Sequence, residues 1–81
     1  MNHEESFKHW LPANNVNGDS VKSYISYLKS VEKYLGLTID ELLKSDLNIG
    51  LERINKISER SDNTRNNYKT ALKKYHQFLK W

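Results

Sequence analysis

Apolar residues recur along this chain at spacings of three and four, which is the period of an α-helix. Strict alternation of apolar and polar residues, the pattern of a half-buried β-strand, does not occur. Polar turns separate the periodic segments. The pattern predicts an all-α fold class, a compact bundle of four to five helices.

The N-terminal segment, residues 4–11, predicts a short leading helix. Its three large apolar residues fall at i, i+3 and i+4 and therefore share one face: Phe7, Trp10 and Leu11. We expect Pro12 to end this helix, because proline disfavours helical geometry in the residue before it. Residues 12–19 collect Asn, Gly and Asp and predict a loop.

A long second helix is expected to begin with Asp19 or Ser20 as its N-cap and to end at Gly36. Its apolar residues form one stripe: Val21, Tyr24, Ile25, Leu28, Val31 and Leu35. A stripe of this width predicts a helix that buries one face and exposes the other.

Two shorter helices are expected next, each with a sequence signal at its start. Thr38 and Glu41 have the spacing of a capping box, and the helix they begin is expected to end near Ser45. Asp46 can cap the following helix, in which Gly50 costs about 1 kcal/mol relative to alanine. The inward residues of that helix are expected to be Leu47, Leu51, Ile54 and Ile57.

The C-terminal segment has the most regular stripe, and Ser61, Asp62 or Asn63 is expected to start its helix. The apolar residues that repeat along it are Tyr68, Ala71, Leu72, Tyr75, Phe78 and Leu79. This helix is therefore expected to contribute a large part of the core.

Length and composition narrow the class of protein. A chain of 81 residues builds one core, so residues 1–81 are expected to form a single domain. Cysteine is absent, which excludes disulfides and thiolate metal sites and favours a reducing, cytoplasmic setting. Apolar runs of no more than two residues predict no membrane span.

The charge of the chain is concentrated at its C-terminal end. Residues 63–81 carry five cations and no acid, so the other residues sum to −2 against an overall charge of +3. On a helical wheel four of these five cations and one histidine share an arc of about 80°. They are Arg65, Lys69, Lys73, His76 and Lys80, with Asn66 in the adjoining arc. Such a face offers charges for phosphates and an amide for base edges.

A second basic ridge is expected on the helix that begins near Ser20, where Lys22, Lys29 and Lys33 line up at i, i+7 and i+11. Lysines on a helix surface also serve solubility, and cations near a helix C-terminus suit its dipole. Arg65 is different, because in the first turn a cation opposes the dipole. The residues alone leave DNA binding and solubility open as explanations.

No pattern of catalytic residues is present. His3, His9 and His76 lie in separate segments without a ligand partner at i+4, and the chain has no glycine-rich phosphate loop or nucleophile elbow. We therefore expect no enzyme activity, no cofactor and no metal site.

The sequence from Thr64 to Leu79 resembles the last helix of the core-binding, SAM-like domain of tyrosine recombinases, the phage-integrase type. The shared pattern is Thr, an aromatic residue four positions on at Tyr68, Ala71-Leu72, and then further aromatic residues and Leu. Residues 20–24 are similar to that family's Thr-x-x-x-Tyr opening of its second helix, with Ser in place of Thr. Related domains stand at the N-termini of some restriction-type nucleases.

This resemblance implies a four-to-five-helix SAM-like bundle that forms half of a clamp around double-stranded DNA. In the family the second and last helices face the major groove, which would bring both basic ridges onto DNA. Strand cleavage belongs to a separate catalytic domain, here expected C-terminal to residue 81. The hypothesis is a DNA-binding domain without catalysis of its own. The alternatives are a protein-interaction module, whose basic helix docks on an acidic partner, and a free-standing competitor of a recombinase or nuclease.

Overall fold

The computed structural model describes residues 3–44 and 46–80, and over these residues it confirms the all-α fold class, with five helices and no strand. The helices are α1 (Glu4–Ala13), α2 (Gly18–Leu35), α3 (Ile39–Leu42), α4 (Leu47–Asn55) and α5 (Asp62–Leu79). The expected end of the third helix near Ser45 lies outside the described residues. The molecule measures 33 × 25 × 18 Å.

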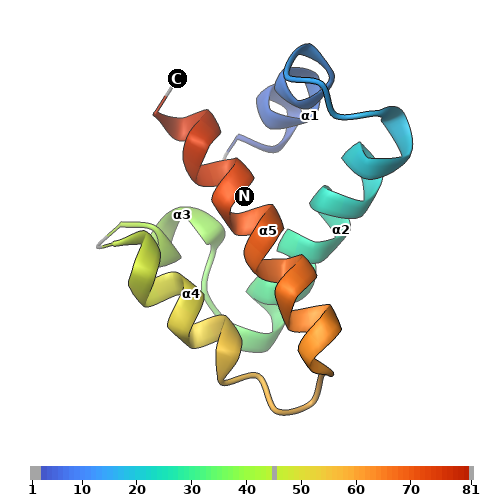
Figure 1. Ribbon diagram of the computed structural model, residues 1–81. Coiled ribbons are helices and arrows are strands. Elements are labelled where there is room, and N and C mark those ends of the chain that lie inside the picture. The colour runs from blue at the N-terminus through green and yellow to red at the C-terminus, as the bar shows by residue number, and fades with distance from the viewer. Residues whose placement is uncertain (1–2, 45, 81) are drawn as a thin grey trace.

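Helix α5 runs through the middle of the bundle, with α1 and α2 on one side and α3 and α4 on the other (Figure 1). Its stripe supplies four buried residues, Tyr68, Ala71, Leu72 and Tyr75. The other helices place their own apolar stripes against it. The fully buried large side chains from these helices are Phe7, Leu11, Leu28, Val31, Ile39 and Ile54.

The end of α1 and the start of α2 differ from the sequence prediction. Pro12 does not end α1, which continues to Ala13, because the burial of Leu11 outweighs the local preference against helix before proline. The predicted N-cap of α2, Asp19 or Ser20, is wrong. Asn17 is the cap, and its side-chain oxygen accepts a hydrogen bond of 3.0 Å from the Ser20 amide.

The other helix boundaries follow the predicted signals. Thr38 and Glu41 form the capping box, and Gly36 adopts the left-handed conformation at the end of α2. Asp46 caps α4 and Ser61 caps α5. Helix α4 ends before Ile57, so Ile57 is buried from the loop and not from the helix.

An aromatic cluster joins α1 to the C-terminal half of α5. The ring of Phe7 lies 5.0 Å from Tyr75 and 5.4 Å from Phe78, and the ring of Trp10 lies 5.7 Å from Phe78. The Tyr75 hydroxyl donates a hydrogen bond of 2.8 Å to Asp40 in the first turn of α3. Tyr75 therefore connects three helices.

Gly50 allows α4 to approach α5 closely. A Cβ atom at this position would lie 3.0 Å from Leu72 Cδ2 and 3.3 Å from Leu42 Cγ. Gly50 is buried, and the close packing that it permits against two helices offsets the low helix propensity of glycine.

We expect Gly50→Leu to lower the free energy of unfolding by about 1–3 kcal/mol, because a larger side chain must displace Leu72 and Leu42. Gly18→Ala is the matched control, since a Cβ atom at Gly18 has no heavy atom within 4 Å, and it should change stability by less than about 0.5 kcal/mol. Urea titration measures both. Equal stabilities of the two variants would contradict the close contact at Gly50.

The burial of Tyr75 and its hydrogen bond to Asp40 raise the pKa of the phenol above its ordinary value of 10.0. The folded state then keeps the proton at a pH where the unfolded chain releases it. The contribution of Tyr75 to the free energy of unfolding should be fully present below pH 10. Above pH 10 the free energy of unfolding should fall by about 1.4 kcal/mol per pH unit. Tyr75→Phe should remove this part of the alkaline slope, as measured by urea titrations between pH 9 and pH 11. An unchanged slope would contradict the prediction.

Candidate nucleic-acid interface

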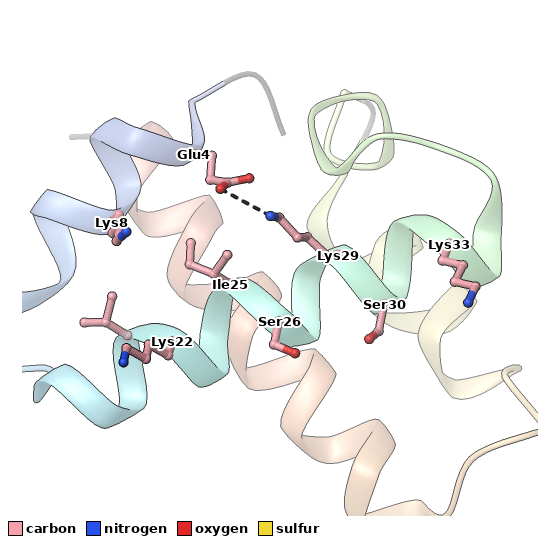
Figure 2. Close-up of a pocket in the computed structure, with 9 residues that line it drawn as sticks. Glu4, Lys8, Lys22, Ile25, Ser26, Lys29, Ser30 and Lys33 are labelled. Carbon is pink, nitrogen blue, oxygen red and sulfur yellow. Dashed lines mark ion pairs between the residues drawn. The ribbon is translucent and has the colours of Figure 1, made fainter.

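The lysines predicted on the second helix are all exposed and line one groove. Lys22, Lys29 and Lys33 project from α2 at spacings of seven and four residues, as Figure 2 shows. The groove has a volume of about 500 Å³ and lies between α1 and α2. The apolar floor beneath the lysines comes from Val21 and Ile25. The three lysines of the predicted ridge are therefore exposed along one groove, which Ile25 also lines.

Helix α1 adds two groups to this groove that the sequence analysis did not single out. Lys8 brings a fourth cation, and Glu4 forms an ion pair of 3.3 Å with Lys29 (Figure 2). Glu4 and Lys8 are four residues apart on the flank of the Phe7 and Leu11 stripe, so the sequence indicates that they share a helix face. Their position beside α2 depends on helix packing and could not be predicted from the sequence.

The predicted residues of the last helix fall in a second groove and on the surface beyond it. Arg65, Asn66 and Lys69 line a depression of about 450 Å³ together with Asn55 of α4 and Asp62. Farther along α5, Lys73 and Lys80 are exposed and His76 is half-buried. The ridge seen on the helical wheel thus extends along the outer face of α5.

Arg65 is held by the fold itself. Its guanidinium donates hydrogen bonds of 2.8 Å to the Ile57 carbonyl and 2.6 Å to the Arg60 carbonyl, and it pairs with Asp62. The partner Asp62 lies one residue before the acid-free stretch. These contacts explain a cation in the first turn of α5, because the arginine closes the loop between α4 and α5 and is neutralised by an acid of the same turn.

The structure separates the two basic ridges. The α2 lysines line a groove shared with α1, whereas Arg65, Asn66 and Lys69 of α5 line a groove shared with Asn55 of α4. In Figure 2, α5 passes behind α2, on the far side from the labelled lysines. The α2 lysines and the first turns of the α5 ridge therefore line two separate grooves.

The aromatic residues that flank the stripes take part in packing. Tyr27 lies 5.9 Å from the ring of Tyr68, and the guanidinium of Arg60 lies 5.3 Å from the centre of the Tyr34 ring. These two tyrosines connect α2 to α5 and to the loop before it.

Comparison with known proteins adds no relative: the chain matches no family model, no curated protein and no solved structure. Within residues 3–44 and 46–80, no group of three or more acidic, histidine or cysteine side chains is placed to hold a metal ion. No helix in this part of the chain is long and apolar enough to cross a membrane.

We expect Arg65→Ala to destabilise the protein by about 1–3 kcal/mol, because two loop carbonyls and Asp62 lose a charged donor. Arg65→Lys should recover only part of this loss, since an ammonium lacks the planar fork of donors. Thermal unfolding compares both with Lys73→Ala, whose exposed side chain is expected to contribute little. Equal melting temperatures for Arg65→Ala and Lys73→Ala would contradict a structural role for Arg65.

Proposed function

We propose that this protein binds double-stranded DNA through the outer face of α5. The observation that carries the proposal is the basic ridge of this helix, in which Lys69, Lys73 and Lys80 occupy one side without an acid from residue 63 onward. Lys69 and Lys73 are separated by one turn, about 6 Å along the helix axis. A row of lysines along one side of a helix can form ion pairs with the phosphates along a groove of the duplex.

Polar side chains beside the ridge supply groups that can contact base edges. Asn66 is exposed in the first turn of the ridge, and Gln77 is exposed near its other end. Amides of this kind donate and accept hydrogen bonds at adenine in the major groove. The role of the lysines is to position the helix on the phosphates, and the role of the amides is to distinguish the base pairs.

The resemblance to recombinase domains supports the same helix as the DNA-contacting element. It also implies contacts from Lys22, Lys29 and Lys33 of α2. Because those lysines line a different groove, the proposal rests on α5. The fold provides a rigid support for binding, and the proposed function includes no catalytic step.

Binding should weaken steeply with salt. With Arg65 engaged in the fold, about three lysines remain to neutralise phosphates, which gives a slope near −2.7 for log K against log salt. The affinity is then expected to fall about fortyfold between 50 and 200 mM salt. Anisotropy titrations of a labelled duplex at several salt concentrations measure this slope. Absence of binding at low salt would overturn the proposal.

Reversal of charge on the ridge should abolish duplex binding without unfolding the protein. The variant is Lys69→Glu with Lys73→Glu, which places repulsive groups where the phosphates would lie. The control is Arg53→Glu with Lys56→Glu, which changes the net charge equally at two exposed residues that do not line the groove beside α5. Circular dichroism verifies the fold of both. Equal loss of binding in both variants would show bulk electrostatics and no specific face.

A further inference from the structure

The groove between α1 and α2 differs in kind from the ridge of α5. It combines a volume of about 500 Å³ with an apolar floor and a basic rim. We propose that this groove binds an acidic peptide segment of a partner protein that carries apolar side chains between its carboxylates. The inference is independent of DNA binding by α5 and concerns another surface of the molecule.

The charge around the groove selects an acidic ligand. Among its lining residues in the described part of the chain, four are lysines, namely Lys8, Lys22, Lys29 and Lys33, and Glu4 is the only acid. Lys22 and Lys33 are separated by eleven residues, roughly 16 Å along the axis of α2. A ligand must therefore extend over about three helical turns to reach the whole rim, which suits a peptide better than a small anion.

The ion pair between Glu4 and Lys29 shows how a carboxylate engages the rim. The two side chains come from different helices and meet at 3.3 Å between the positions of Lys22 and Lys33, as the dashed line in Figure 2 marks. Both remain partly exposed, so the pair stays in contact with water. A carboxylate from a partner can form the same kind of ion pair with Lys22 or Lys33 along the rim.

The floor of the groove favours a peptide over a nucleic acid. Val21 is 5% exposed and Ile25 is half-buried, and both line the groove beneath the lysines. Ile25 lies between Lys22 and Lys29 and points toward α1 in Figure 2. A phosphate backbone gains nothing from an apolar floor, whereas leucine or phenylalanine gains free energy by leaving water there. Ser26 and Ser30 add hydroxyl groups to the lining of the groove.

The test uses synthetic peptides as probes against the full chain. The first is a labelled, helix-forming, glutamate-rich peptide of about three turns with two leucines spaced four residues apart, so that both lie on one face. The second has glutamine in place of both leucines. We expect the first peptide to bind at least tenfold more tightly than the second, since each buried leucine contributes a factor of about ten. Equal affinities would overturn the proposal, because binding would then depend on charge alone.

Two charge-reversed variants locate the site. Lys22→Glu with Lys33→Glu alters exposed residues of the groove and should weaken binding of the leucine peptide at least tenfold. The matched control, Lys69→Glu with Lys73→Glu, has the same net charge and should leave peptide binding unchanged. Circular dichroism confirms that both variants are folded. Peptide binding that is lost equally in both, or retained in the groove variant, would overturn the assignment.

A competition experiment separates this inference from the function proposed for α5. Unlabelled duplex DNA at a concentration that saturates the protein should not displace the leucine peptide, because the two ligands use different surfaces. Displacement by DNA would overturn the peptide site and identify the groove as part of the nucleic-acid surface. Failure of duplex binding, with peptide binding intact, would refute only the function proposed for α5.

Discussion

The apolar stripe of α5 is the surface on which the rest of the bundle is built. A chain this short forms one core, and four residues of that core come from this single helix. Tyr75 shows the dependence most clearly, because its ring meets Phe7 of α1 while its hydroxyl reaches Asp40 of α3. Since the stripe covers one side of α5, the basic ridge lies beside it, with Lys69 half-buried and Lys73 and Lys80 exposed.

Most of this arrangement could be predicted from the sequence. Helical periodicity identifies which residues face inward, and the capping signals at Thr38, Asp46 and Ser61 mark helix starts correctly. The errors occur where two local signals compete. Asn17, Asp19 and Ser20 are all good N-caps, and the choice of Asn17 depends on the path of the loop before α2. At Pro12 the packing of Leu11 outweighs a local rule.

The candidate sites were less predictable than the core, because a helical wheel places a residue on a face without showing what lies opposite. Arg65 has the sequence features of a DNA contact, yet its guanidinium is bound to carbonyls of the loop that precedes α5. Lys8 has no such features, yet the packing of α1 on α2 brings it to the rim of a groove. Both outcomes depend on contacts outside a single helix, with the adjoining loop for Arg65 and with α2 for Lys8.

The positions of the acids explain how a weakly basic chain presents two basic surfaces. Several acidic side chains hold helix ends and turns: Glu32 accepts from the Ile39 amide, Asp46 caps α4, and Asp62 pairs with Arg65. The lysines of α2 and α5 instead lie along the faces of these helices, as far as Lys33 in the last turn of α2 and Lys80 at the C-cap of α5. Because these acids lie at helix ends and turns and the lysines lie along helix faces, the negative and positive charges are separated in space. The surface field along each long helix is therefore stronger than the net charge of +3 indicates.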